Sequence, residues 1–296
     1  MKFYYSPKYE IDIGQHVFPI IKYRLVHDRL IREKVARPED FIDPGEATDG
    51  DLLLVHTPEY LSKLENGTFS AEEISRMEIP YNKGMVGPGK IFANGSIQAF
   101  KYALKNGVGV HIGGGFHHAY PDHGEGFCLI NDIGIGIRKI QQEKSAKKVL
   151  VVDCDVHQGN GTAAIFKDDP NVFTFSIHQE HNYPQKKEKS TYDISVADAI
   201  GDNDYLYNLR DNLPKMLEEF KPDLIIFVAG ADVYQFDQLG GLDLTISGLR
   251  KRDEYVFREA KKHAIPIATV YGGGYAQKVE DTVTIHVNTI KAALGL

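Results

Sequence analysis

The segment Lys148–Gly161 reads KVLVVDCDVHQGNG, an apolar β-branched run that passes directly into aspartates, a histidine and glycines. A short Val/Ile-rich run bounded by turn residues is typical of a buried strand. Runs of the same kind, each followed by Gly or His, recur at Val108–Ile112, Val172–Ile177, Leu224–Ala229 and Ile265–Tyr271. The chain is therefore expected to contain at least these five buried strands.

Segments with helical periodicity separate the expected strands. They cover Lys90–Asn106, Leu129–Lys144, Tyr205–Phe220, a helix capped by Ser247, and approximately Val279–Leu294. Pro214 predicts a kink or break, Thr57-Pro58 predicts a helix start, and the glycines of Tyr81–Lys90 favour a loop. Alternating strands and helices predict one α/β domain over residues 1–296, with a mostly parallel sheet flanked by helices.

The composition excludes several classes of protein. The chain has 296 residues, of which 42% are hydrophobic, and its 34 basic and 41 acidic residues give a net charge of −7. This acidity argues against a nucleic-acid partner, and two cysteines can supply neither a disulfide scaffold nor a four-sulfur zinc site. The N-terminus lacks a signal-peptide pattern, and every apolar run is far shorter than the roughly 20 residues of a membrane span. We expect a soluble, cytoplasmic protein without a membrane partner.

Polar residues follow the expected strands, at the edge where ligands bind in open α/β sheets. Asp155 and His157 are two positions apart on an extended segment, so both side chains can converge on one cation. Alone, such a pair is equally compatible with a strand-end acid beside a surface histidine. Asp232 follows another expected strand and is the natural third ligand. Two carboxylates and one imidazole leave positions open for water and substrate, as in catalytic metal sites.

Two further motifs occupy equivalent places. His117 and His118 follow three glycines, and imidazoles beside a metal-activated water can act as general base and acid. Tyr275 also follows three glycines, and its phenol can donate to a developing oxyanion. The alternatives are polar loop histidines and a surface turn tyrosine. We interpret His111, His123, His178 and His181 as local hydrogen-bonding groups, and Cys128 and Cys154 as buried small residues.

Taken together, these motifs resemble the zinc-dependent histone deacetylase superfamily. The resemblance rests on GGGFHH at 113–118, GFC at 126–128, DCDVHQGNG at 153–161, GAD at 230–232 and GGGY at 272–275. Leu239–Leu242 and Lys251–Glu254 are most similar to the class IV subgroup and its bacterial relatives. The resemblance implies an arginase/deacetylase-like fold. It also implies a hydrolase that removes an acetyl or longer acyl group from an acyl-lysine or similar acylated amine.

The resemblance also assigns metal sites. It implies one Zn²⁺ per chain, held by Asp155, His157 and Asp232. A structural K⁺ near the zinc is implied as well, held by the side chains of Asp153 and Ser176 together with backbone carbonyls. Oxygen-rich ligation also suits Fe(II), Co(II) or Mn(II), so the choice of zinc follows from the family.

The family's catalytic and tunnel residues carry over by position. The resemblance implies that His117 and His118 are the paired imidazoles, with His118 as general base and acid and with Asp153 accepting from His117. It implies that Tyr275 binds the acyl oxygen. The residues that would line the substrate tunnel are Gly126, Phe127, Tyr183, Leu239 and Gly273.

Two departures from the family pattern concern pH dependence and substrate. Asn160 stands behind His118 where many relatives have an aspartate, and a neutral amide stabilises an imidazolium less than a carboxylate does. Tyr81–Lys90 offers no counterpart to the acidic rim residue that binds peptide backbone in class I enzymes, so an acetylpolyamine or another small amide stays an alternative substrate. A binuclear manganese ureohydrolase and an inactive acyl-lysine-binding protein are the remaining rivals.

Overall fold

Eight strands form one sheet, and every neighbouring pair is parallel. The computed structural model describes residues 1–296, and the strand order is β2-β1-β3-β8-β7-β4-β5-β6. The strands are β1 Phe3–Tyr4, β2 Phe41–Ile42, β3 Val108–His111, β4 Val149–Asp153, β5 Val172–Gln179, β6 Tyr192–Val196, β7 Leu224–Val228 and β8 Ile267–Val270. All five predicted strands are confirmed as β3, β4, β5, β7 and β8, whereas β1, β2 and β6 were not predicted.

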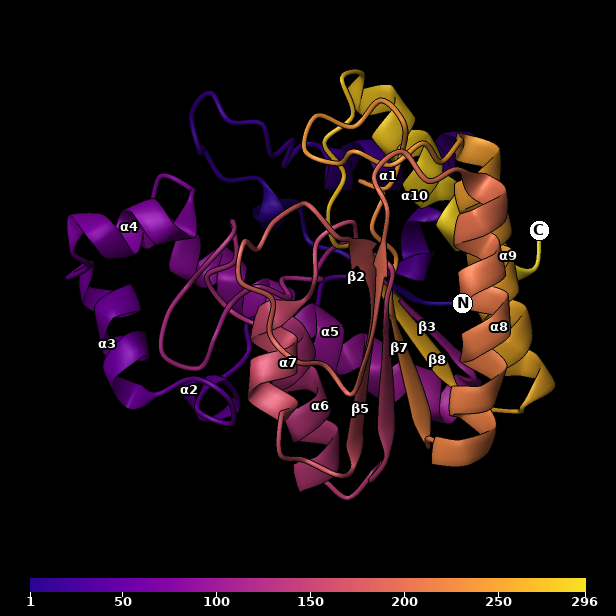
Figure 1. Ribbon diagram of the computed structural model, residues 1–296. Coiled ribbons are helices and arrows are strands. Elements are labelled where there is room, and N and C mark those ends of the chain that lie inside the picture. The colour runs from indigo at the N-terminus through magenta and orange to yellow at the C-terminus, as the bar shows by residue number, and fades with distance from the viewer.

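Helices cover both faces of this sheet (Figure 1). They are α1 Lys22–Arg32, α2 Asp49–Leu52, α3 Pro58–Asn66, α4 Ala71–Met77, α5 Val86–Asn106, α6 Asp132–Gln142, α7 Asn160–Phe166, α8 Asp202–Phe220, α9 Ile246–Lys262 and α10 Val279–Leu294. Helices α5, α6 and α7 lie on one face, α8, α9 and α10 lie on the other, and α2, α3 and α4 form an outlying group. The predicted α/β fold is therefore confirmed.

The sheet is buried on both faces because successive strand residues point to opposite sides. In β4, Val149 and Val151 pack with residues of α5 and α6, such as Phe100. Leu150 and Val152 belong to the cluster on the other face, which includes residues of α8, α9 and α10. Continuous apolar strands therefore predicted the double cover correctly.

The predicted loop at Tyr81–Lys90 is wrong for most of its length. A 3-10 helix occupies Lys83–Met85, and α5 begins at Val86. Pro88 is the third residue of α5, where a backbone N–H would have no partner within the helix, so its ring is tolerated there. Of the residues that suggested a loop, Gly84 lies in the 3-10 helix, and Gly87, Pro88 and Gly89 lie in the first turn of α5.

Two details of the helices also differ from expectation. Helix α9 is capped by Thr245 rather than Ser247, because Thr245 Oγ1 accepts from Gly248 N at 3.0 Å. Helix α8 runs unbroken through Pro214. The proline cannot donate to the carbonyl of Arg210, but the hydroxyl of Tyr255 donates to that oxygen instead, at 3.3 Å. A donor on α9 thus replaces the missing bond and removes the reason for a break.

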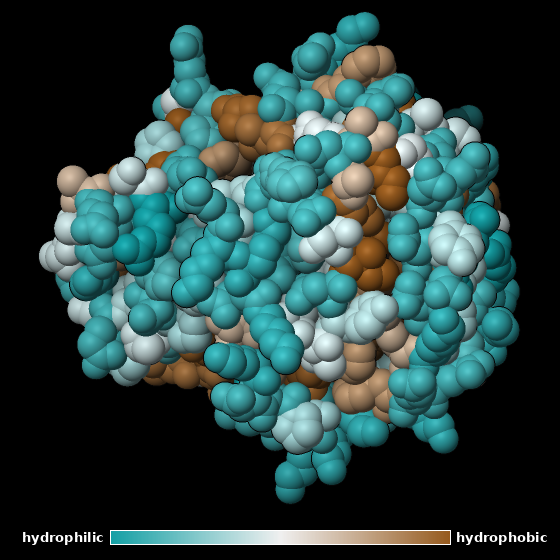
Figure 2. Space-filling model, viewed as in Figure 1, coloured by the Kyte–Doolittle hydropathy of each residue, from teal (hydrophilic) through white to brown (hydrophobic).

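The surface in Figure 2 is mostly hydrophilic, with hydrophobic residues confined to small separate patches in this view. No helix has the length and apolar character needed to cross a membrane.

Candidate metal centre and catalytic site

The predicted site residues meet at the carboxyl ends of four adjacent central strands. Strands β3, β8, β7 and β4 are consecutive neighbours in the sheet, so the loops that follow them share one edge. His117 and His118 come from the loop after β3, and Tyr275 comes from the loop after β8. Asp232 follows β7. The segment Asp153–His157 starts with the last residue of β4 and continues into the loop after it. The topology therefore joins segments that are far apart in the sequence.

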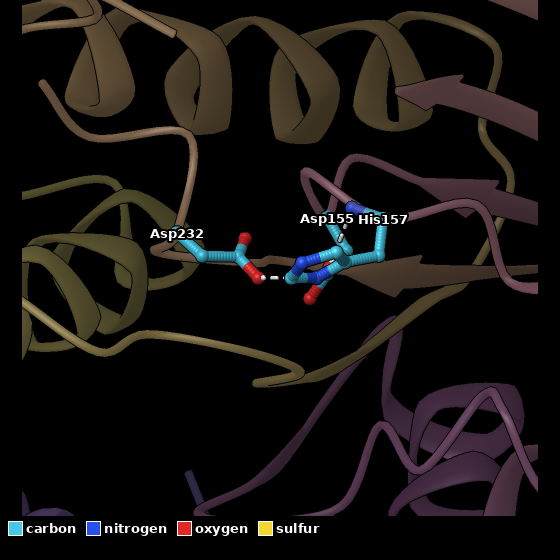
Figure 3. A group of neighbouring side chains, drawn as sticks. All are labelled: Asp155, His157 and Asp232. Carbon is cyan, nitrogen blue, oxygen red and sulfur yellow. Dashed lines mark hydrogen bonds and ion pairs between the residues drawn. The ribbon is translucent and has the colours of Figure 1, made fainter. Parts of the chain in front are cut away.

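Asp155, His157 and Asp232 form a buried group whose potential ligand atoms all lie within 4.8 Å of one another. Figure 3 shows Asp232 approaching from one loop and the other two residues from a second loop. His157 Nδ1 lies 3.1 Å from Asp155 Oδ1 and 3.3 Å from Asp232 Oδ2. One ring nitrogen thus faces both carboxylates, an arrangement suited to a shared cation.

The chemistry of this group requires positive charge. Asp232 is completely buried, and its Oδ2 accepts no hydrogen bond of normal geometry, although His157 Nδ1 lies 3.3 Å away. Burial and the neighbouring Asp155 carboxylate raise the pKa of Asp232 to about 7. Burial alone would lower the pKa of His157, but the two carboxylates outweigh it and raise that pKa to about 10. A divalent cation with oxygen and nitrogen ligands satisfies both the free oxygen and the charge, so the residues fit zinc.

Backbone groups fix the other carboxylate oxygens of the candidate metal site. Gly273 N donates to Asp155 Oδ2 at 2.7 Å, and Val156 N donates to Asp232 Oδ1 at 3.0 Å. Each aspartate is therefore held through an oxygen on one side and keeps a defined orientation. Such outer hydrogen bonds hold metal ligands in position before the metal arrives.

Arg252, a fully buried residue of α9, connects the two ligand loops. Its Nη1 donates to the carbonyl of Cys154 at 3.1 Å and to that of Gly230 at 2.7 Å, while its Nε pairs with Asp253 Oδ1 at 2.8 Å. Both free cysteines are buried, and burial raises the pKa of the Cys154 thiol to about 12, which supports its interpretation as a packing residue. No sequence pattern indicated that a basic residue contacts the loop that carries Cys154.

Glycines allow the loops to approach closely at the site. A Cβ atom on Gly115 would lie 2.3 Å from the backbone N of Gly272, and one on Gly273 would lie 1.9 Å from Asp232 Oδ2. Contacts this short leave no room for a side chain. The predicted tunnel residue Gly273 therefore lies directly against the candidate metal ligands.

The paired histidines contact different side chains, and their pKa values are shifted in opposite directions. His117 Nδ1 lies 2.7 Å from Asp153 Oδ2, and His118 Nδ1 lies 2.7 Å from Asn160 Oδ1. Burial alone would lower the pKa of His117, but Asp153 and Asp155 outweigh it and raise that pKa to about 9. Burial and the two neighbouring imidazoles lower the pKa of His118 well below its usual value. His118 is thus the neutral member of the pair near pH 7.

Tyr275 is buried beside aromatic rings and a lysine. Its ring centroid lies 5.8 Å from that of Phe127 and 6.1 Å from that of Phe18, and Lys22 Nζ lies 5.7 Å from it. Tyr275 N donates to Asp237 Oδ2 at 2.6 Å, which anchors the loop. Burial and nearby carboxylates raise the pKa of Tyr275 well above its usual value, so the phenol keeps its proton.

Of the other predicted tunnel residues, Tyr183 and Gly126 lie beside the imidazoles. The ring of Tyr183 is 4.9 Å from that of His118 and 6.0 Å from that of His157. A Cβ on Gly126 would touch both Tyr183 and His118. Leu239 is partly buried against the main core. The predicted potassium residues Asp153 and Ser176 are directly paired on β4 and β5, and Ser176 Oγ also lies 2.9 Å from His178 Nδ1.

Several residues that support the site were missed by sequence reasoning. Asp132 accepts from the backbone N–H groups of Gly115 and Phe116, directly before the paired histidines. The others are Lys22, which donates to Gly272 O at 3.0 Å, and the residues Glu125, Asp237 and Arg252. None of them lies directly at the end of a predicted strand, so the pattern of polar residues at strand ends does not reveal them.

Comparisons with known proteins agree with this geometry. A family model described as histone deacetylase domain matches residues 16–290. An uncharacterized protein of Picosynechococcus sp. is 39% identical over 290 residues, covering 98% of this chain and 97% of its own. Histone deacetylase 2 of Arabidopsis thaliana is 30% identical over 284 residues, covering 92% and 73%. The acetoin utilization protein AcuC of Bacillus subtilis is 29% identical over 297 residues, covering 92% and 74%.

A solved structure shares the fold. The crystal structure of the HDA15 HD domain matches with a TM-score of 0.82 at 22% sequence identity. The match covers 100% of this chain and 91% of that chain.

Proposed function

Because the chain belongs to the histone deacetylase domain family, we propose that it is a metal-dependent hydrolase that removes an acyl group from an acyl-lysine or similar acylated amine. The observation that carries this proposal is the buried group of Asp155, His157 and Asp232, with its free carboxylate oxygen, beside two imidazoles and a phenol. The segments Leu239–Leu242 and Lys251–Glu254 support a place near the class IV subgroup.

Zinc is the metal that this proposal assigns to the three ligands. When bound there, it would polarise the amide carbonyl and lower the pKa of its bound water to about 7. Asp155, His157 and Asp232 would hold it, and the remaining coordination positions would face water and substrate. The potassium site at Asp153 and Ser176 is proposed with it.

The protein's own residues then move protons and stabilise charge. His118 Nδ1 faces Asn160 Oδ1, and with the proton on Nδ1 the Nε2 atom has a lone pair that would accept a proton from the attacking water. The same imidazole then returns that proton to the leaving amine. Asp153, which contacts His117 Nδ1, acts to raise the pKa of His117, and we assign to this imidazole the stabilisation of negative charge that develops beside it.

Tyr275 acts on the acyl oxygen. Its phenol keeps its proton and donates a hydrogen bond that strengthens as negative charge develops on that oxygen. Phe127 and Tyr183 present rings near Tyr275 and His118, respectively, and are proposed to pack against the methylenes of a lysine-like substrate. Leu239, Gly126 and Gly273 complete the proposed tunnel.

The test is a substrate panel with zinc-loaded protein. Peptides carrying acetyl-lysine or myristoyl-lysine, together with acetylated polyamines, are assayed for release of the free amine. We expect one zinc per chain by elemental analysis and hydrolysis of at least one of these amides. The Asp232→Asn variant, which removes one anionic ligand, should lose both the zinc and the activity. Two metals per chain, or no hydrolysis of any amide with one zinc bound, would overturn the proposal.

A further inference from the structure

Glu125 contacts the amide that holds His118, although it lies outside the residues that would touch metal or substrate. Asn160 Nδ2 donates to Glu125 Oε1 at 2.6 Å, while Asn160 Oδ1 faces His118 Nδ1 at 2.7 Å. We infer that Glu125 is a positioning residue that fixes the orientation of the Asn160 amide and, through it, the tautomer of His118. This inference rests on the proposed function, in which His118 accepts a proton.

The ionised carboxylate of Glu125 determines which atoms of Asn160 and His118 donate and which accept. An ionised carboxylate only accepts hydrogen bonds, so Glu125 requires the NH₂ side of the Asn160 amide to face it. The carbonyl oxygen of the amide must then face His118, and an oxygen acceptor requires a proton on His118 Nδ1. His118 Nε2 is therefore left without a proton. Without the carboxylate, an asparagine can turn by 180° and hold either tautomer.

Glu125 is held firmly in the place that this role requires. Its backbone N–H donates to Cys128 O at 3.0 Å and its carbonyl accepts from Cys128 N at 2.9 Å, which closes a tight turn. Its second carboxylate oxygen pairs with His123 Nε2 at 3.4 Å. Partial burial acts to raise the pKa of Glu125, but the contacts with His123 and Asn160 outweigh it and lower that pKa. The group is thus ionised when it faces the amide.

The two histidines also differ in how close a carboxylate lies to the imidazole. Asp153 contacts His117 directly, whereas the carboxylate behind His118 is one residue further away, with a neutral amide between them. Such an amide transmits orientation and only a weakened electrostatic attraction. His118 is therefore held in one tautomer without being pushed toward the cationic form, which suits a group that must accept a proton.

The tautomer of His118 can be measured directly. We would record ¹⁵N spectra of the histidine side chains in the zinc-loaded, full-length protein, in which Nδ1–H and Nε2–H rings give distinct shifts. Wild type should show His118 as a single Nδ1–H tautomer. Glu125→Gln should show both tautomers, because its amide can accept from or donate to Asn160. A single unchanged tautomer in Glu125→Gln would overturn the inference, whether or not the protein is active.

A double variant that exchanges the carboxylate and the amide tests the same pattern of donors and acceptors. It also distinguishes this pattern from a general structural effect of replacing Glu125. In the Asn160→Asp/Glu125→Gln double variant, an acceptor-only carboxylate again faces His118 and an amide donor faces that carboxylate. The Nδ1–H tautomer should be restored, and a mixture in the double variant would overturn the inference. Melting curves monitored by circular dichroism would confirm that each variant is folded.

Activity provides the second readout, once a substrate has been found. Glu125→Gln should lower kcat by about tenfold with little change in KM, the scale of one charge-assisted hydrogen bond. Glu188→Gln is the matched control, because Glu125 and Glu188 both line one surface pocket, but the Glu188 carboxylate contacts Tyr120 rather than Asn160. In an Asn160→Ala background, Glu125→Gln should have no further effect on kcat. If Glu125→Gln lowers kcat by the same factor in this background as in wild type, Glu125 does not act through Asn160.

Discussion

Replacing Gly273 by alanine should destroy the metal site while leaving the fold intact. The added Cβ would lie 1.9 Å from Asp232 Oδ2 and 2.9 Å from Asp155 Oδ2. To reach the 3.4 Å at which ordinary contact begins, Asp232 Oδ2 must retreat by about 1.5 Å. Metal–ligand distances are held to within about 0.2 Å, so a carboxylate displaced this far no longer coordinates.

The magnitude of this effect follows from the loss of one of three protein ligands. Disturbing only an outer hydrogen bond of a metal site weakens binding by about 10–100-fold, so losing the ligand itself should weaken zinc binding by at least about 100-fold. Zinc affinity would be measured by competition with a chromophoric chelator, and the fold by circular dichroism.

The matched control for this prediction is Gly50→Ala. Gly50 lies in α2, where a Cβ would meet only Thr48 Oγ1, at an ordinary 3.7 Å. Its zinc affinity should equal that of wild type. If Gly273→Ala binds one zinc with wild-type affinity, then Asp232 is not a ligand or its loop is far softer than its burial implies.

Other predictions concern Tyr275, Arg252 and the pH dependence of zinc binding. Tyr275→Phe should lower kcat by about 10²–10³, the effect of losing one oxyanion donor, with zinc affinity unchanged; an unchanged kcat would refute its role. Arg252→Met leaves the Asp253 carboxylate buried without its partner, so the free energy of unfolding should fall by about 3–5 kcal/mol. Urea titrations followed by circular dichroism would measure this loss, since the chain has no tryptophan, and a loss below about 1 kcal/mol would contradict it. In the metal-free protein, Asp232 and His157 have raised pKa values of about 7 and about 10, so protons compete with the cation. Zinc affinity should therefore rise as the pH increases from about 6 to about 8, with protons released on binding in calorimetry; a pH-independent affinity would contradict the shared-cation interpretation.

The central sheet was predictable because its strands are continuous apolar runs with a strong local signal. The missed strands lack that signal: β1 and β2 have two residues each, and β6 is an edge strand whose first residue, Tyr192, is exposed. Their pairing depends on neighbours that are distant in the sequence. The unbroken helix at Pro214 likewise depends on Tyr255, a contact that no local pattern reveals.

The candidate metal group was predictable because its residues follow predicted strands. A parallel sheet places such residues at one edge, so Asp155, His157 and Asp232 could be joined without knowing any distance. Glu125 and Arg252 could not be found in this way. Glu125 lies in a turn, and Arg252 lies on a helix among other charged residues, so only the three-dimensional contacts separate them from ordinary surface groups.

The contact between the loops after β3 and β8 limits how this protein can diverge. Tyr271 N donates to Gly113 O and Gly272 N donates to Gly114 O, both at 3.1 Å, and a Cβ on Gly115 would penetrate the opposite loop. A side chain at Gly115 would therefore displace both loops, and because the atoms in its way belong to the backbone, a smaller neighbouring side chain cannot create the missing space. Duplicated copies of the gene are therefore expected to acquire new substrates through outer segments such as 184–188, which border the surface pocket, while the interior of the site stays the same.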